Sequence, residues 1–306
     1  MTTSYDAIVI GSGPNGLAAA IQIALAGRSV CVLEANETIG GGARSAELTL
    51  PGFIHDICSA VHPLAAGSPF FSRLPLEQHG LKFVYPPVSL AHPFDDGSVV
   101  TLERSVKATS ERLMEDTQAY QKLFGPLVER WDDLAADVLG PPRFPRHLLP
   151  VAQFGWLAIR SARGLAQSRF SNDKSRAVFA GLAAHSFLSL ERLGTAGFGL
   201  MLGAMAHSVG WPIGQGGSQN ITNALVSYLR ELGGEVVTNH RVASLRELPS
   251  AKAIICDLTP RQVIHVAGDS LPASFLRKLG RYRYGPGAFK LDWALSSPSL
   301  GKLKSV

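Results

Sequence analysis

Residues 5–44 read YDAIVIGSGPNGLAAAIQIALAGRSVCVLEANETIGGGAR, and this stretch decides the fold. It opens on a short apolar run rich in β-branched residues and passes at once into a glycine turn. The pattern predicts a strand, a glycine turn, a helix, a second strand and an acidic residue, over residues 5–10, 11–16, 17–26, 29–33 and Glu34. That order is typical of a dinucleotide-binding unit, whereas an incidental glycine turn would lack the flanking elements.

Each residue of the glycine turn has a physical role in this interpretation. Gly11 permits the tight turn after the strand, and Gly13 lets a pyrophosphate approach the backbone. Gly16 lets the helix pack close to the sheet. Pro14 and Asn15 lie at the start of the helix, where unpaired N–H groups and a partial positive charge favour phosphate.

A second glycine turn distinguishes between dinucleotides. Glu34 stands where an acid binds ribose hydroxyls in such units. The run Gly40, Gly41 and Gly42 can form a concave set of N–H groups for an anion, and Arg44 can add a charged contact to phosphate. An NAD dehydrogenase does not need this second device, so the turn favours FAD; the alternative is a flexible loop with a solvated arginine.

With these residues, Gly11–Arg44 resembles the FAD-binding start of the phytoene-dehydrogenase-like flavoproteins, within the wider amine-oxidase-like group. The resemblance continues through residues 51–56, 214–218 and 233–237 and covers most of the chain. The branch it resembles is the one named for a pyridine nucleotide-disulfide oxidoreductase domain. The activity implied is hydride transfer between flavin and an apolar, unsaturated or isoprenoid-like substrate, for which no catalytic residue is identified.

The resemblance also implies an α/β fold in two interleaved domains. A Rossmann-like FAD-binding domain would comprise residues 1–75 and 213–265. A mixed α+β substrate domain would comprise residues 76–212 and 266–306. In the family, a residue at the position of Val242 contacts the adenine end through its backbone.

One departure from the family pattern concerns the end of the chain. Nothing after Phe289 resembles the second FAD segment of the family, which contacts the flavin ring, so we expect a C-terminally truncated form. Four interpretations stay open: a fragment of an oxidoreductase, one half of a two-chain enzyme, a non-catalytic paralogue that acts in binding, and an NAD-binding protein.

Composition narrows the class of partner. The net charge of +5 is concentrated near the end: residues 271–306 hold seven Lys and Arg but one acid, so residues 1–270 carry about −1. This distribution gives no case for nucleic-acid binding, and it leaves either a solvated basic end or contact with anionic lipid. The three cysteines are far apart, without disulfide or zinc spacing, so no metal site is expected.

No targeting or membrane-spanning segment is predicted. Residues 7–27 are uncharged, but Pro14, Asn15 and the glycines interrupt them, and no basic region precedes them. We therefore expect a cytoplasmic protein, with peripheral membrane contact as an addition.

The rest of the chain is predicted from its periodicity. Strands are expected at residues 81–84, 89–94, 99–102, 253–256 (buried) and 289–295, and residues 235–238 and 241–245 are expected to form two strands or one interrupted strand. Helices are expected at 105–139 with an interruption at Gly125-Pro126, and at 151–169, 173–189, 194–208 and 221–232. His55, Asp56, His185 and His207 each have two interpretations, as groups of the active site or as hydrogen-bonded structural residues.

Overall fold

The computed structural model describes residues 4–297, which form two compact units. Of the described residues, the first unit holds 4–60, 75–83 and 213–294, and the second holds 61–74, 84–212 and 295–297. These bounds differ from the division expected from the sequence: residues 76–83 and 266–294 lie with the first unit, and residues 61–74 with the second.

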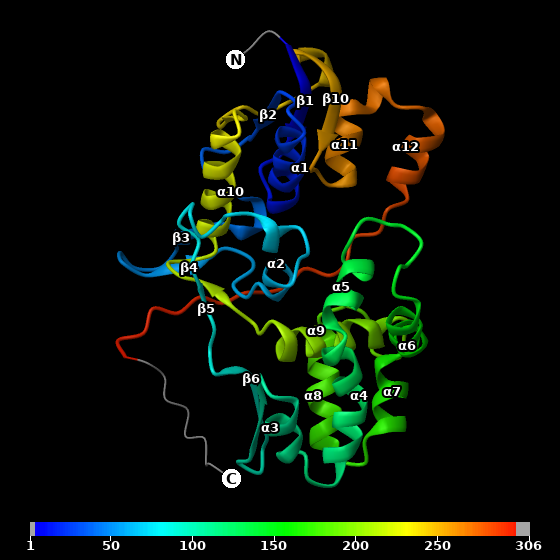
Figure 1. Ribbon diagram of the computed structural model, residues 1–306. Helices are drawn as coiled ribbons and strands as arrows, with labels where there is room; N and C mark the ends of the chain where they lie inside the picture. The colour runs from blue at the N-terminus through cyan, green and yellow to red at the C-terminus, as the bar shows by residue number, and fades with distance from the viewer. Residues whose placement is uncertain (1–3, 298–306) are drawn as a thin grey trace. The chain divides into compact units, whose positions relative to one another are not determined.

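A parallel four-stranded sheet forms the centre of the first unit (Figure 1). Its order is β10 (Ser250–Cys256), β1 (Ser4–Ile10), β2 (Val30–Leu33) and β9 (Glu235–Val237). Ile8 lies opposite Ile254 on one side and opposite Cys31 on the other. The predicted α/β, Rossmann-like fold is confirmed by this parallel sheet and the helices that cover it.

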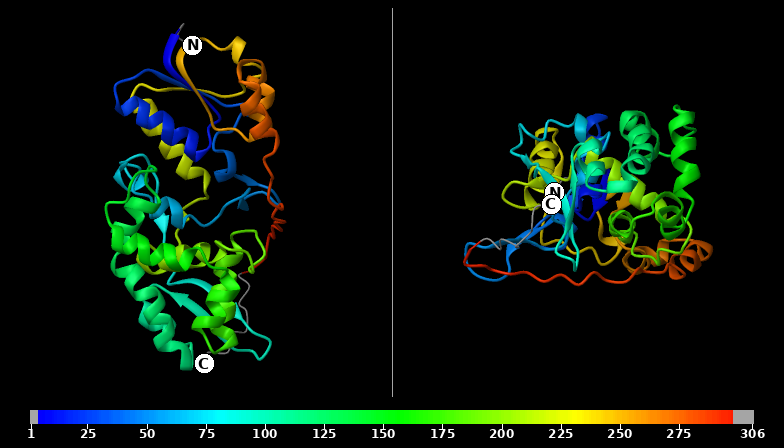
Figure 2. Two further views of the ribbon diagram at one scale, coloured as in Figure 1. Left: turned by 90° about the vertical axis from the view of Figure 1, so that its right-hand side faces the viewer. Right: turned by 90° about the horizontal axis from the view of Figure 1, so that it is seen from below.

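Helices cover both faces of this sheet. The helices α1 (Pro14–Leu25) and α10 (Gln219–Glu231) lie side by side on one face (Figure 2). On the other face, Val266 of α11 (Pro260–Ala267) packs in a buried cluster with Ile8 and Ile10. Because β1 is covered on both faces, its residues form a nearly continuous apolar run rather than an alternating pattern.

Smaller elements complete the first unit. Its remaining strands are the antiparallel pair β3 (Ser45–Glu47) and β4 (Ile54–Asp56), with β5 (Phe83–Val84) and β8 (Ile213–Gly214) where the chain passes between units. Its remaining helical segments are η1 (Gly41–Ala43), η4 (Leu245–Glu247), η5 (Gly268–Ser270) and α12 (Ala273–Gly280).

The second unit is a helical cluster with one antiparallel hairpin, β6 (Val88–Pro93) and β7 (Val99–Glu103). A turn at residues 95–97 connects these two strands. Its helical segments are α2 (Pro63–Ala66), η2 (Phe71–Arg73), α3 (Val106–Glu111), η3 (Met114–Asp116), α4 (Thr117–Glu129), α5 (Trp131–Val138), α6 (Leu148–Ala158), α7 (Ala162–Arg169), α8 (Asp173–Ala184) and α9 (Thr195–Ser208). The helix α9 packs against α4, α6, α7 and α8, so it lies at the centre of the apolar core.

One predicted helix interruption and one predicted continuous helix were wrong. The helix α4 continues through Pro126 to Glu129, because burial of Leu123, Phe124 and Leu127 compensates for the missing proline N–H. By contrast, the block predicted as one helix over residues 151–169 is α6 and α7. The break occurs where Ser161 adopts an extended backbone and its side chain accepts a hydrogen bond from the N–H of Gly164.

Two predicted strands do not form, and a third is less buried than predicted. Residues 241–245 are not a strand, since the chain turns at Asn239 (φ +54°) and its neighbour His240 donates through its N–H to the carbonyl of Glu34. Residues 289–295 are also irregular, and Phe289 is 93% exposed. The strand β10 forms but lies at the edge of the sheet, with Ile254 exposed. The helix predicted at 173–189 ends at Ala184.

Candidate functional site

A cavity of about 640 Å³ lies in the first unit, at the carboxyl ends of β1, β2 and β10. In a parallel sheet this edge, beside the turn into a helix, is where ligands bind. The cavity is lined by residues from both glycine turns, from the segment that follows each of β2, β9 and β10, and from α11: Ile10–Asn15, Leu33–Asn36, Gly41, Gly42, His240–Ala243, Asp257, Leu258, Arg261, Gln262, His265 and Val266.

The first glycine turn has the geometry that its sequence predicts. Gly11 has φ +104°, a conformation that L side chains rarely adopt. A Cβ atom at Gly16 would lie 2.4 Å from the carbonyl oxygen of Gly11, so only glycine allows α1 to start this close to the strand. The backbone therefore leaves β1 sharply and presents the N-terminus of α1 to the cavity.

Unused backbone donors mark the cavity as a site for an anion. Among the described residues, none accepts a hydrogen bond from the N–H groups of Gly13, Asn15, Gly41 or Gly42. All four of these residues line the cavity. Gly13 is half-buried, and Asn15, Gly41 and Gly42 are exposed, so their N–H groups are accessible from the cavity. Four accessible, unused donors beside a helix N-terminus are suited to phosphate oxygens.

The two glycine turns lie against each other. A Cβ atom at Gly41 would be 3.1 Å from the Cα of Gly13. The N–H of Gly40 donates to Oγ of Ser12 at 3.1 Å. The second turn therefore faces the same cavity as the first, as two elements that share one diphosphate must.

Glu34 is buried at the end of β2, and the protein already satisfies its carboxylate. Oε2 accepts hydrogen bonds from the N–H of Ser12 (3.1 Å) and from its hydroxyl (2.6 Å). Oε1 accepts from the N–H of Asn36 (2.9 Å) and from its side-chain amide (2.8 Å). Burial raises the pKa of Glu34, but these four hydrogen bonds outweigh burial and hold the pKa below its ordinary value.

Asp257 is a site residue to which the sequence assigned no role. It directly follows β10, and its Oδ2 accepts a hydrogen bond from the N–H of Gly16 at 3.0 Å. A Cβ atom at Gly13 would lie 2.6 Å from the same oxygen. The absence of a side chain at Gly13 therefore makes room for this carboxylate as well as for a ligand.

The helix α11 adds polar side chains that sequence reasoning also missed. Arg261, Gln262 and His265 line the cavity. The guanidinium carbon of Arg261 lies 4.9 Å from the ring centroid of Tyr284. The signal that could have found these residues was positional: α11 begins at the carboxyl end of a strand that pairs in parallel with β1.

The structure brings most of the predicted cofactor-binding residues together. The residues that line the cavity are Gly11, Gly13, Pro14, Asn15, Glu34, Gly41, Gly42 and Val242. Gly16 lies beside it, and its N–H is taken by Asp257. Arg44 is outside the lining, where its Nε donates to the carbonyl of Gly41 at 2.9 Å.

The histidines and the aspartate considered as groups of the active site have structural partners. His207 is buried, and its Nδ1 lies 3.2 Å from the carbonyl oxygen of Arg104. Because a carbonyl oxygen can only accept, Nδ1 donates to it, and Nε2 accepts a hydrogen bond from the hydroxyl of Tyr120 at 2.8 Å. Burial lowers the pKa of His207. Asp56 accepts a hydrogen bond from the N–H of Ser218, Nε2 of His55 contacts the hydroxyl of Thr49, and Nδ1 of His185 contacts the carbonyl of Gly181. None of these three residues, His55, Asp56 and His185, lines the cavity.

Two further properties concern the described part of the chain. Within residues 4–297, no group of three or more His, Cys, Asp or Glu side chains could hold a metal ion. None of the helices in the same range has the length and apolarity that a transmembrane segment needs.

Two curated relatives are similar to part of the chain. Mouse pyridine nucleotide-disulfide oxidoreductase domain-containing protein 2 is 33% identical over 129 residues, which cover 39% of this chain and 22% of the mouse protein. One of the subunits of limonene dehydrogenase from Castellaniella defragrans is 28% identical over 123 residues, with the same two coverages. The matched part thus spans less than a quarter of either relative.

The fold and the family are shown over most of the chain. An oxidoreductase from Methanosarcina mazei superposes with a TM-score of 0.61 at 16% identity, covering 90% of this chain and 65% of that one. The family model described as FAD dependent oxidoreductase matches residues 6–270. FAD, predicted from the paired glycine turns, is the cofactor of that family. The chain therefore belongs to the FAD-dependent oxidoreductase family.

Proposed function

We propose that the first unit binds the adenosine diphosphate part of FAD in the 640 Å³ cavity, and that the chain serves a phytoene-dehydrogenase-like oxidation of an apolar, unsaturated substrate. The observation that carries the cofactor site is the set of four unused N–H donors at Gly13, Asn15, Gly41 and Gly42. They belong to two turns that lie against each other, so they suit a diphosphate better than one phosphate.

The other lining residues have complementary tasks. Glu34 would bind ribose hydroxyls, for which the amide of Asn36 must release Oε1. Val242, which is buried beside the cavity, would meet the adenine end through its backbone. Arg261 would supply a positive charge from α11. When bound, FAD supplies the hydride acceptor, while these residues only bind and orient its adenosine diphosphate part.

The substrate class rests on the relatives and on the sequence resemblance. One similar protein is named as a component of limonene dehydrogenase, and limonene is an apolar, unsaturated isoprenoid. A dehydrogenation of that class removes a hydride from one substrate carbon and a proton from a neighbouring one. The cavity is proposed for the adenosine diphosphate part of FAD and not for the substrate, so we assign no catalytic residue.

The same relative supports the two-chain interpretation, because its name describes one component of a multi-chain enzyme. In that case a second polypeptide would complete the flavin site. The non-catalytic alternative is a paralogue in which binding persists without turnover. Sequencing the reading frames beside this one distinguishes them: a neighbouring frame with a glycine-rich FAD segment supports the two-chain enzyme.

The cofactor proposal is tested by ligand competition. We expect the purified chain to bind FAD, with visible flavin absorption, and we expect ADP to compete because it carries the recognised part of the cofactor. Riboflavin, which lacks the adenosine diphosphate, should bind far more weakly. Calorimetric preference for NAD over FAD would instead favour the NAD-binding interpretation, and no binding of either would refute the site.

The substrate proposal is tested separately. The FAD-loaded chain, with its second polypeptide if one is found, is mixed with limonene and with longer isoprenoids under anaerobic conditions. Bleaching of the oxidised flavin band by these compounds, but not by the saturated analogues, is expected. Bleaching by primary amines alone would place the activity in another class.

A further inference from the structure

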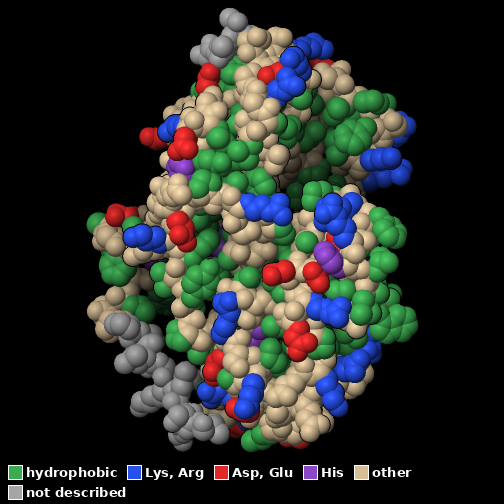
Figure 3. All heavy atoms as spheres, viewed as in Figure 1, with side chains coloured by type: hydrophobic (Ala, Val, Ile, Leu, Met, Phe, Trp, Pro, Cys, Tyr) green, Lys and Arg blue, Asp and Glu red, His purple; other side chains and the backbone are tan. Residues whose placement is uncertain are grey.

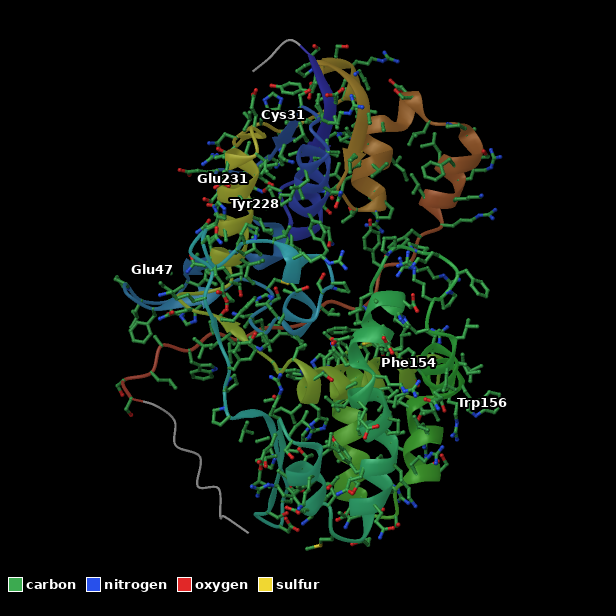
Figure 4. The ribbon with its side chains drawn as sticks, in the orientation of Figure 1. Cys31, Glu47, Phe154, Trp156, Tyr228 and Glu231 are labelled. Carbon is green, nitrogen blue, oxygen red and sulfur yellow. The ribbon has the colours of Figure 1, made fainter. Side chains whose placement is uncertain are left out.

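The outer face of α6 is apolar and exposed. Residues at helical spacing along it are exposed rather than buried, and only one of them is polar: Leu148, Leu149, Ala152, Gln153, Trp156 and Ile159. Trp156 is 75% exposed and points away from the helices, whereas Phe154 on the opposite face packs against the core of the second unit (Figure 4). Because the inner face already anchors α6, the outer face is not needed for folding.

The apolar surface extends beyond the helix. The N–H of Gly194 donates to the carbonyl of Ile159 at 3.0 Å, which holds the preceding Leu193 beside the end of α6. Leu193 is 82% exposed and Ile159 61%. Contiguous exposed apolar side chains of this size mark an interaction surface. We name Leu148, Leu149, Ala152, Trp156, Ile159 and Leu193 the α6 face.

The chain segment that contains α6 carries charges of one sign, and acidic residues of other segments lie beside it. Residues 138–172 contain five arginines and no acidic residue or lysine. Arg143 and Arg146 precede α6, and Arg160 and Arg163 follow it. Arg143 contacts Asp137 and Arg163 contacts Glu191, so acids from outside the segment pair with two of the five. Basic and apolar side chains gather together at this edge of the second unit (Figure 3).

We propose that the α6 face docks on an anionic lipid surface, with α6 parallel to the membrane plane. A tryptophan and leucines on one face, with arginines at both ends, fit an interfacial helix. At 11 residues α6 is too short to span a bilayer. The arginines match lipid phosphates, and an apolar substrate would be drawn from the same surface. The docking itself does not depend on FAD binding.

Vesicle co-sedimentation of the full chain tests the docking. Vesicles of phosphatidylcholine with phosphatidylglycerol should pellet the protein, and phosphatidylcholine alone should bind at least about tenfold more weakly, since each arginine near an anionic surface adds to binding. The double substitution Leu149→Gln with Trp156→Ser should reduce binding to anionic vesicles at least tenfold. Arg146→Glu should also weaken it.

A matched control uses the other exposed tryptophan. Trp293 is 67% exposed but belongs to the first unit, so Trp293→Ser should leave vesicle binding unchanged. In Trp293→Phe, Trp156 is the one remaining exposed tryptophan, because Trp131 and Trp211 are buried. Brominated lipids should then quench its emission. Thermal melts monitored by circular dichroism verify that each variant is folded.

Several results would overturn the proposal. The proposal is wrong if the folded wild-type chain does not pellet with anionic vesicles, or if it binds both vesicle types equally. It is also wrong if the double variant binds anionic vesicles as well as the wild-type chain does. Sedimentation equilibrium tests the alternative occupant of the α6 face, which is a second copy of the chain. A dimer abolished by the double variant, without vesicle binding, would assign the α6 face to self-association.

Discussion

The carboxylate of Asp257 accepts a hydrogen bond from the N–H of Gly16 at 3.0 Å, although 241 residues separate them. A negative charge thus stabilises the N-terminus of α1 at the edge of the cavity proposed for a diphosphate. The charge that supports the glycine turn therefore opposes the ligand.

Asp257→Asn separates these two effects. The amide oxygen can still accept from Gly16, but the charge is lost. We expect FAD to bind about fivefold more tightly, corresponding to about 1 kcal/mol of relieved repulsion. The free energy of unfolding should fall by about 0.3–1 kcal/mol with the loss of the charge–dipole interaction. Calorimetry measures the affinity for FAD, and urea titration measures the free energy of unfolding. Weaker FAD binding would mean that the carboxylate holds the glycine turn in the conformation that binds the cofactor.

Gly13→Ala and Gly16→Ala should respond differently to removal of Asp257. The new Cβ at residue 13 meets a side-chain oxygen of Asp257 at 2.6 Å, while its φ of −62° suits alanine. We expect a cost of about 1–3 kcal/mol, largely recovered when combined with Asp257→Ala. The Cβ at residue 16 also meets the backbone oxygen of Gly11 at 2.4 Å, so that variant should not be rescued. Equal rescue in urea unfolding would contradict this packing.

Glu34→Gln should alter the dependence of stability on pH. Hydrogen bonds hold the folded-state pKa of Glu34 below its ordinary value of about 4.5. Its contribution is therefore complete above about pH 4.5 and is lost as the pH falls through the lower folded-state pKa. At pH 7 we expect the variant to be about 1–3 kcal/mol less stable, a difference that shrinks in acid. Unfolding of both proteins at pH 7, 5.5, 4.5 and 3.5 tests this. A difference in unfolding free energy that stays constant over this range would show that titration of Glu34 does not contribute.

Arg261 and Arg44 can be ranked as the cation that contacts phosphate. Arg261 lines the cavity, whereas Nε of Arg44 donates to the carbonyl of Gly41 in its own loop. We expect Arg261→Gln to weaken FAD binding about tenfold, through loss of a charge-assisted hydrogen bond, and Arg44→Gln to have a smaller effect. The two variants serve as matched controls in the same titration. The reverse order would favour the role that the sequence predicts for Arg44.

Tyr120→Phe should destabilise the second unit without affecting the cofactor. It removes the hydroxyl that donates to Nε2 of buried His207 and leaves that nitrogen unpaired. The expected loss is about 1–3 kcal/mol of unfolding free energy. The dissociation constant for FAD should stay unchanged, since neither residue lines the cavity. A loss of FAD affinity at unchanged stability would instead argue for a functional histidine.

Local patterns predicted the elements that depend on neighbours in sequence. The strands β1 and β2, the turn at Gly11 and the helix α10 follow from apolar runs, glycine and periodicity. Patterns failed where long-range packing decided the outcome. Burial carries α4 past Pro126, and the cap at Ser161 divides α6 from α7. Residues 289–295 have strand-like composition, but composition alone does not supply a pairing strand.

The sequence by itself determined one wall of the site, which residues 11–42 form. Its two glycine turns, the start of its helix and its acidic residue are all local features of one short stretch of chain. Only the tertiary structure decided the opposite wall. Parallel pairing of β10 with β1 places Asp257 and α11 at the cavity, and it joins residues that are more than two hundred positions apart. Such pairing depends on burial of the whole sheet, which no local pattern encodes.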